Sequence, residues 1–313
     1  MRRSPGTAHA VGVGFVVLAL LAAGCSTGSD DADADASDPP TTPVAATEPS
    51  GTTATAPGAT STTSTTTTTT STTSTSTTST TTSTTIAVPD VPGALDLTAP
   101  VVGLGRSVNG APIVAERIGE LGGRPVVVIG VIHGDEDDGV AIIDELRSNP
   151  VPAGVELWLI ESMNPDGQAA QVRQNANGVD LNRNFPYKWG VIGAPGDSQY
   201  AGIGPASEPE TQAIVNFVGQ LRPEIVIWYH QDLFVISPAE GREGRVRARY
   251  AELTNWPRGG ISGGTYTGVA ATWARNELSS DDGVAFIVEL GPTLSPEDAE
   301  LHANAVRIVG AEG

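Results

Sequence analysis

The stretch Val131-Ile-His-Gly-Asp-Glu136 places a histidine and a glutamate directly behind the apolar run Val126–Ile132. A short apolar run of this kind is typical of a buried strand in a parallel sheet. We therefore expect His133 and Glu136 at the carboxyl-terminal edge of that sheet, where the sites of α/β folds gather. Imidazole nitrogen and carboxylate oxygen are zinc ligands, and catalytic zinc sites hold three protein ligands. The stretch predicts two of them.

The third ligand is expected from the end of another strand. The run Ile225–Tyr229 leads into His230 in the same manner. The chain has only four histidines, and of the other two His9 lies in an N-terminal leader and His302 in a late helical stretch. An H-x-x-E pattern alone is more often an accident than a metal site, with each histidine a surface or core residue. The motifs further along the chain decide between these interpretations.

Apolar runs alternate with amphipathic stretches over most of the chain. The predicted strands are Val126–Ile132, Val155–Ile160, Ile225–Tyr229 and Val284–Leu290, and residues 105–113 precede a further one; the predicted helices are Val140–Arg147, Glu208–Leu221, Arg245–Leu253, Gly268–Leu278 and Pro296–Val309. Ser207, with Glu210 three residues later, predicts a capping box at the second helix. The alternation predicts a single α/β domain over residues 89–313, with a mainly parallel mixed β-sheet and helices on both faces.

Further motifs follow the first histidine in a fixed order. They are Asn164-Pro-Asp-Gly167, the stretch Arg173–Pro186, which contains Asp180-Leu-Asn-Arg183, and Phe286-Ile-Val-Glu-Leu290. In order and approximate spacing they resemble the zinc carboxypeptidase family, over roughly residues 101–309. The resemblance implies one zinc ion, held by His133, Glu136 and His230. His133-Gly-Asp-Glu136 and Tyr229-His-Gln231 look most like the bacterial murein peptide amidase branch, which cleaves near diaminopimelate in peptidoglycan stem peptides.

The resemblance also implies roles for the remaining site residues. Glu289 corresponds to the general base, and its place in an apolar strand supports a purpose, because burying a carboxylate is costly. Arg173 corresponds to the oxyanion donor, and Asn182 with Arg183 to the clamp for the terminal carboxylate of the substrate. Asp180 corresponds to the carboxylate that orients a zinc-bound histidine. Tyr266 is the candidate for the tyrosine that closes over the substrate; its spacing to the next glycine departs from the family pattern, so a plain loop aromatic is the alternative.

The N-terminal segment has the pattern of an export signal. Arg2 and Arg3 precede the apolar stretch 11–21, and small residues lead into Cys25, the only cysteine. This resembles a bacterial lipobox, which implies a lipoprotein signal peptide over residues 1–25 with Cys25 lipidated; a plain signal with an incidental cysteine is the alternative. The Thr/Ser/Pro-rich residues 26–88 predict a disordered tether. We expect an exported protein, lipid-anchored on the outer face of the cytoplasmic membrane and reaching into the cell wall.

Composition narrows the function classes. The chain has 36 acidic and 17 basic residues and a formal net charge of −19, which disfavours nucleic-acid partners. The predicted function is that of a monomeric zinc metallocarboxypeptidase acting on peptide, with peptidoglycan stem peptide as the specific substrate expected. The alternatives are a zinc deacylase of the aspartoacylase or desuccinylase type, which shares H-x-x-E and D-L-N-R, and a non-catalytic lipoprotein that binds cell-wall peptides. The complete Asn-Pro-Asp-Gly motif favours a peptidase over the deacylase, and retention of Arg173 and Glu289 argues against loss of catalysis.

Overall fold

Six strands form one sheet in the order β1-β2-β4-β3-β5-β6 in the computed structural model, which describes residues 88, 93–261 and 264–313. The strands are β1 Val101–Arg106, β2 Pro112–Gly119, β3 Arg124–Val131, β4 Val155–Ser162, β5 Ile225–Gln231 and β6 Val284–Leu290. Strands β4, β3, β5 and β6 pair in parallel, whereas β1 with β2 and β2 with β4 are antiparallel. The predicted mainly parallel mixed sheet is confirmed.

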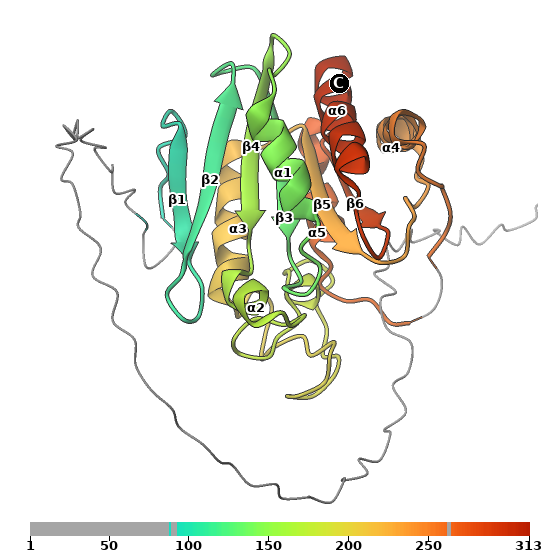
Figure 1. The fold of residues 1–313 in the computed structure, drawn as a ribbon. Helices are drawn as coiled ribbons and strands as arrows, with labels where there is room; N and C mark the ends of the chain where they lie inside the picture. The colour runs from blue at the N-terminus through green and yellow to red at the C-terminus, as the bar shows by residue number, and fades with distance from the viewer. Residues whose placement is uncertain (1–87, 89–92, 262–263) are drawn as a thin grey trace, which may run out of the picture. The chain divides into compact units, whose positions relative to one another are not determined.

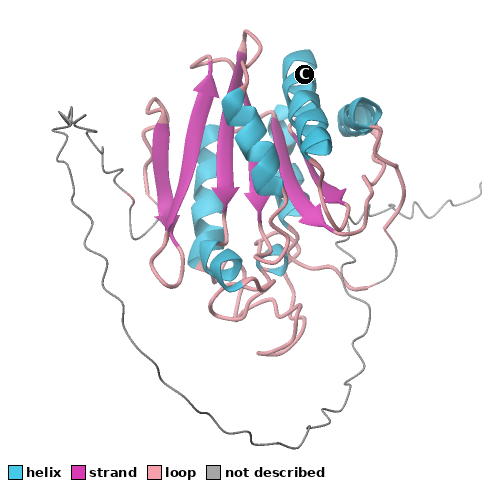
Figure 2. Ribbon diagram, in the orientation of Figure 1, coloured by secondary structure: helices cyan, strands magenta, loops and turns pink. Residues whose placement is uncertain are grey.

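Helices cover both faces of this sheet (Figures 1 and 2). They are α1 Gly139–Ser148, α2 Pro165–Ala170, α3 Pro209–Leu221, α4 Gly241–Thr254, α5 Ala270–Glu277 and α6 Pro296–Glu312, with short 3-10 helices at Leu181–Arg183 and Ser279–Asp281. The four strands predicted with bounds and all five predicted helices are present, with ends shifted by a few residues, and β2 is the further strand expected after residues 105–113. Strand β1 and the short helix α2 were not among the predicted elements.

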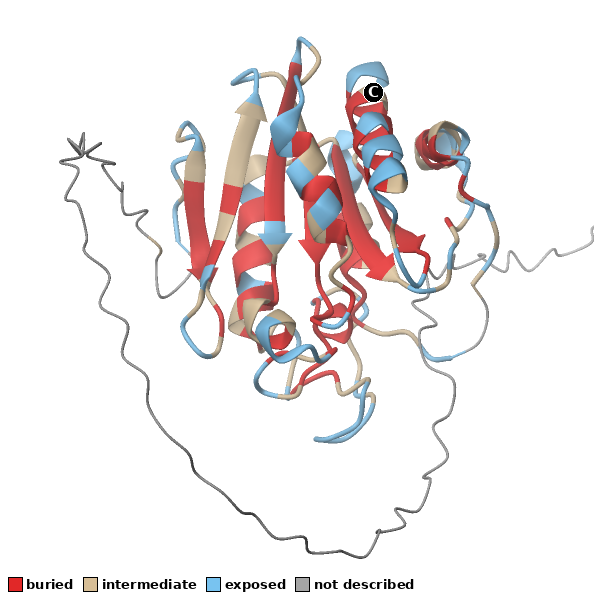
Figure 3. Ribbon diagram, viewed as in Figure 1, coloured by how far each residue is buried: buried red, intermediate tan, exposed pale blue. Residues whose placement is uncertain are grey.

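Two apolar cores flank the sheet, one on each face. Along β3, Val127 and Ile129 belong to the core that includes α3 and α5, while Val126 and Val128 belong to the core that includes α1, α4 and α6. Central strands are therefore buried on both sides, as Figure 3 shows for the middle of the sheet. This double burial explains why these strands are continuous apolar runs rather than alternating ones.

The predicted capping box at Ser207 is wrong. Helix α3 begins one residue later than a Ser207 cap requires, because Pro209 occupies the first turn and Glu208 is the extended N-cap residue. The Ser207 hydroxyl donates to Glu208 Oε1 at 2.7 Å, and Glu210 Oε1 accepts the Val108 N–H at 2.9 Å. The two capping residues thus serve neighbouring loops instead of the helix end.

The carboxyl ends of the parallel strands all reach one edge of the sheet, at the bottom of Figure 1, where long loops gather. The predicted leader, Cys25 and the tether up to residue 87 lie outside the described residues. Within the described part of the chain, no helix has both the length and the apolar character needed to cross a membrane.

Candidate metal centre

Three buried donors meet where β3 and β5 end. The ligand atoms of His133, Glu136 and His230 all lie within 4.8 Å of one another. His133 Nδ1 lies 2.9 Å from Glu136 Oε1, and His230 Nδ1 lies 3.1 Å from Glu136 Oε2. Both histidines therefore turn the same ring nitrogen toward one carboxylate. Two imidazoles and a carboxylate form the donor set of a catalytic zinc site, so the residues present fit this metal.

Electrostatics in this cluster favour opposite charges on the histidine and the carboxylates. Burial and Arg173 each lower the pKa of His133, but Glu136 and Asp180 raise it to about 10 overall. Burial raises the pKa of Glu136, whereas His133 and His230 lower it to about 2. The carboxylate is therefore ionised throughout the physiological range, as a metal ligand must be.

Asp180 holds the far side of the His133 ring. Its Oδ1 lies 3.1 Å from His133 Nε2 and also accepts the Asn182 N–H at 2.9 Å. Burial raises the pKa of Asp180, but Arg173, Arg183 and His133 outweigh it and hold that pKa well below its usual range. An ionised carboxylate on Nε2 leaves Nδ1 directed at Glu136, which is the orienting contact expected for a metal-binding histidine.

Arg173 lies against the same cluster. Its Nη1 donates to Glu136 Oε1 at 3.0 Å, and its Nη2 donates to Asp180 Oδ2 at 3.0 Å. The side chain is nearly buried, at 8% exposure. The guanidinium is thus fixed by two carboxylates beside the metal donors.

Glu289 lies on the strand next to His230. The two residues are in register across the parallel pair β5 and β6, so their side chains project to the same face of the sheet. Glu289 is 1% exposed. Its backbone exchanges hydrogen bonds with Val235, and its carbonyl also accepts the Trp256 indole N–H at 2.8 Å. The outer edge of β6 is therefore fixed at this residue.

The predicted carboxylate clamp lies on the 3-10 helix Leu181–Arg183. Asn182 Oδ1 accepts the Ala270 N–H at 3.0 Å, while its buried Nδ2 has no hydrogen-bond partner among the described residues. Arg183 is completely buried, and its guanidinium carbon lies 5.2 Å from the centre of the Tyr266 ring. The structure thus brings Tyr266 and Arg183 together, although the motif spacing left the tyrosine ambiguous.

The Asn164-Pro-Asp-Gly167 motif holds the loop that carries His133 and Glu136. Asn164 Nδ2 donates to the carbonyls of Ile132 and Arg173, at 3.1 and 3.2 Å, and its Oδ1 caps α2 by accepting the Gly167 N–H. Gly134 packs directly on this turn: a Cβ there would lie 2.0 Å from the Gly167 carbonyl carbon. The motif is therefore a joint between the His133 loop and the Arg173 loop, and only glycine fits at the contact.

Two residues beside the metal donors, Asp138 and Gln231, were not predicted as site residues from the sequence. Gln231 donates its backbone N–H to Glu136 Oε2 at 3.0 Å, and its side-chain amide contacts Asp138. The only signal in the sequence is their position, directly after His230 and two residues after Glu136.

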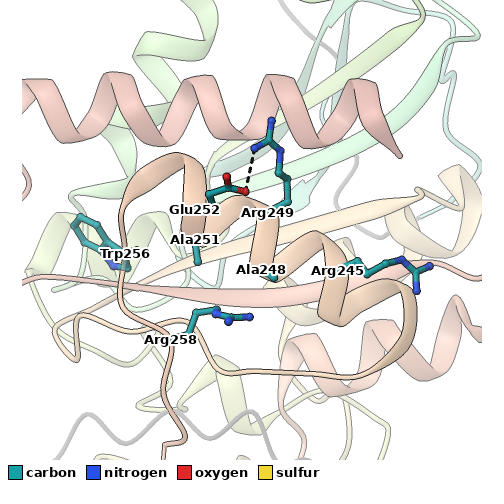
Figure 4. Close-up of a pocket in the computed structure, with 7 residues that line it drawn as sticks. All are labelled: Arg245, Ala248, Arg249, Ala251, Glu252, Trp256 and Arg258. Carbon is teal, nitrogen blue, oxygen red and sulfur yellow. Dashed lines mark hydrogen bonds and ion pairs between the residues drawn. The ribbon is translucent and has the colours of Figure 1, made fainter.

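A separate surface pocket of about 590 Å³ lies along α4 and the segment that follows it (Figure 4). It is lined by Arg245, Ala248, Arg249, Ala251, Glu252, Trp256 and Arg258. Arg249 is paired with Glu252 at 3.1 Å, the dashed line in Figure 4. None of the predicted site residues lines this pocket.

Comparison with known proteins agrees with the predicted resemblance to zinc carboxypeptidases. Residues 97–238 match the family model described as zinc carboxypeptidase. Murein peptide amidase A of Escherichia coli (strain K12) is 31% identical over 163 residues, which cover 49% of this chain and 64% of that protein. The match thus spans somewhat less than two thirds of the length of this curated relative.

Two solved structures share the fold. The murein-tripeptide amidase of Escherichia coli O157 has a TM-score of 0.54 and 25% sequence identity, over 71% of this chain and 93% of that one. Carboxypeptidase A from Helicoverpa armigera has a TM-score of 0.59 and 18% identity, over 68% of this chain and 67% of that one. At that identity, the second likeness speaks for the fold alone.

Proposed function

We propose that this chain, whose residues 97–238 match the zinc carboxypeptidase family model, is a zinc-dependent metallocarboxypeptidase that hydrolyses a peptide bond. One observation carries the proposal: the buried donors His133, Glu136 and His230 lie within 4.8 Å of one another, beside the in-register carboxylate of Glu289. A single zinc ion held by these donors would act as a Lewis acid and lower the pKa of water toward neutrality.

The chain itself supplies the proton transfer. Glu289 is the base: it takes a proton from the attacking water and returns it to the leaving amine, a task that calls for a carboxylate kept from bulk solvent. Its burial and the fixed backbone of β6 support this role. Arg173 lies beside the donors and would stabilise the negative charge that develops on the scissile carbonyl oxygen.

Recognition of a chain end falls to Asn182 and Arg183. A guanidinium offers two parallel N–H donors that match a carboxylate, and Asn182 Nδ2, which has no partner among the described residues, adds a further donor. Tyr266, next to Arg183, would cover the bound end of the substrate. This arrangement supports removal of C-terminal residues over internal cleavage.

The substrate we favour is a peptidoglycan stem peptide. The relatives named murein peptide amidase support this class, as does the predicted lipid anchor at Cys25 with its tether. In this proposal the enzyme is a monomer held on the outer face of the cytoplasmic membrane, with its catalytic domain in the cell wall.

Mass spectrometry of products tests the activity and the substrate together. Zinc-loaded protein is incubated with purified stem peptides, ordinary L-peptides with free or amidated ends, and N-acyl amino acids. We expect cleavage of free-ended peptides, with stem peptides preferred, and none by the Glu289→Gln control. Equal cleavage of amidated peptides would exclude a carboxypeptidase, and a preference for N-acyl amino acids would establish the deacylase alternative.

Localisation needs a separate experiment. Cys25→Ser should abolish incorporation of labelled fatty acid and leave the protein unprocessed or in the medium. Labelling equal to that of the unmodified chain would refute lipidation at Cys25.

A further inference from the structure

Asp138 and Gln231 form a reciprocal pair at the rim of the metal site. The Asp138 N–H donates to Gln231 Oε1 at 3.1 Å, and Gln231 Nε2 donates back to Asp138 Oδ2 at 3.0 Å. These two hydrogen bonds join the loop after β3 to the end of β5, which are far apart in the sequence. We call these two residues the rim brace.

The rim brace joins three strand ends. Asp138 belongs to the loop after β3, and Gln231 is the last residue of β5. Asp138 Oδ2 also accepts the Leu294 N–H at 2.7 Å, and Gln231 Nε2 reaches the Gly291 carbonyl at 3.4 Å. Gly291 and Leu294 follow β6, which carries Glu289. The ends of the three strands that carry or lead into the metal donors and Glu289 are thus joined by two side chains.

The rim brace also reaches a metal donor directly. The backbone N–H of Gln231 donates to Glu136 Oε2 at 3.0 Å, the same oxygen that faces His230 Nδ1. A shift of Gln231 would therefore rotate the Glu136 carboxylate relative to His230. Groups that orient a ligand in this way commonly change metal affinity when they are removed.

We propose that Asp138 and Gln231 are positioning residues that set the geometry of the His133, Glu136 and His230 donors and thereby the affinity for zinc. This inference rests on the proposed function, because it requires those donors to hold the metal. Neither side chain is itself a ligand, since each is occupied by the other and by the β6 loop.

The test is the zinc affinity of folded, metal-stripped full-length protein, measured by competition with a chromophoric chelator. Gln231→Met keeps the length of the side chain but removes its amide, and Asp138→Ala removes the carboxylate. Each should weaken zinc binding by roughly ten- to a hundred-fold. The double variant should bind zinc only slightly less tightly than the single variant with the lower zinc affinity, because the two residues act as one unit.

Two further variants serve as controls. Asp137→Ala removes the adjacent half-buried aspartate, whose Oδ2 accepts a hydrogen bond from Gln171 Nε2 at 3.1 Å, and should leave zinc affinity unchanged. Asp138→Asn keeps one acceptor oxygen and should recover most of the affinity lost in Asp138→Ala. Absorption of the cobalt-substituted protein should shift in the brace variants and not in Asp137→Ala.

The outcomes separate the two proposals. Unchanged zinc affinity in Gln231→Met and Asp138→Ala, with only a lowered melting temperature, would make the brace purely structural and overturn the inference. If Asp138→Ala does not fold, Gln231→Glu, which sets a second carboxylate against Asp138, decides by the same measurement. Failure of the unmodified protein to bind zinc would instead overturn the proposed function itself.

Discussion

Two fully buried histidines, His133 and His302, show how surroundings decide the chemistry of one side chain. His133 faces two carboxylates, Glu136 and Asp180, which raise its pKa to about 10 despite burial. His302, on α6, lies among aromatic rings, and burial lowers its pKa to about 4 against a weaker opposing effect of Asp298. Burial acts on both rings in the same direction, so the carboxylates make the difference.

The environment of His302 is that of a structural residue. Its Nδ1 lies 2.8 Å from the Tyr250 hydroxyl, which in turn lies 2.7 Å from the Tyr229 hydroxyl. This short chain links α6, α4 and β5 inside one of the two cores. Neutral imidazole suits such a place, whereas the His133 ring lies between two ionised carboxylates. We therefore expect changes at the two histidines to differ in kind.

The largest difference should appear in metal content. His133→Ala removes a predicted zinc ligand, so zinc by elemental analysis should fall from one per chain to background and peptide hydrolysis should fall with it. His302→Ala should keep one zinc per chain. Stoichiometric zinc in His133→Ala, or its loss in His302→Ala, would break the comparison.

Within the His133 cluster and its neighbouring strand, Glu289→Gln separates proton transfer from metal binding. The substitution keeps volume and removes the base, so zinc content should stay at one per chain while kcat falls by roughly 10²- to 10⁴-fold. Steady-state kinetics with a free-ended peptide measures this loss. A kcat within a few-fold of that of the unmodified enzyme would remove Glu289 from the mechanism.

The acid stability of the domain should depend on His302. Because its pKa is about 4 in the folded state and 6.5 unfolded, the unfolded chain binds the proton more readily. Stability should therefore fall as pH drops from about 6.5 to 4, by on the order of 3 kcal/mol from this residue. His302→Leu should flatten that part of a urea-unfolding profile, even if its stability at neutral pH is lower. An unchanged acid slope in the variant would contradict the shift.

The smallest effect is expected at Trp256, which contacts both His302 and the strand that carries Glu289. Its ring lies 4.5 Å from that of His302, and its indole N–H donates to the Glu289 carbonyl. Trp256→Phe loses one hydrogen bond, worth about 1 kcal/mol, while Val235 still donates to that carbonyl. We expect a melting temperature lowered by a few degrees and a slight loss of kcat. Trp158→Phe, which loses an indole bond to Glu156, is the matched control and should leave kcat unchanged.

Much of the fold and of the donor set follows from local sequence. Parallel strands buried on both faces are continuous apolar runs, so residues such as His133 and His230 can be placed at strand ends from the order of amino acids alone. The register of β5 with β6 then puts Glu289 beside His230. The predicted roles of Arg173, Asn182, Arg183 and Tyr266 depend on the resemblance and still need the experiments above.

What local sequence could not predict depends on distant partners. Ser207 has the spacing of a cap, but Pro209 and the contact with Glu208 direct it elsewhere. Asp138 and Gln231 are common polar residues, and nothing near either one in the chain indicates the other. Helix α2 is short and held by Asn164 contacts to two other segments, so its own composition gives little signal.

The strand order also determines which pairings must form before the site is complete. The metal donors come from β3 and β5, which are neighbours in the middle of the sheet, whereas Glu289 arrives with β6, which can only add to the outer side of β5. Parallel pairing joins segments far apart in the chain and is slow for that reason. Both long-range pairings, β3 with β5 and β5 with β6, must therefore form before the three donors and Glu289 lie together, so a chain that has formed only one of them does not yet have the complete site.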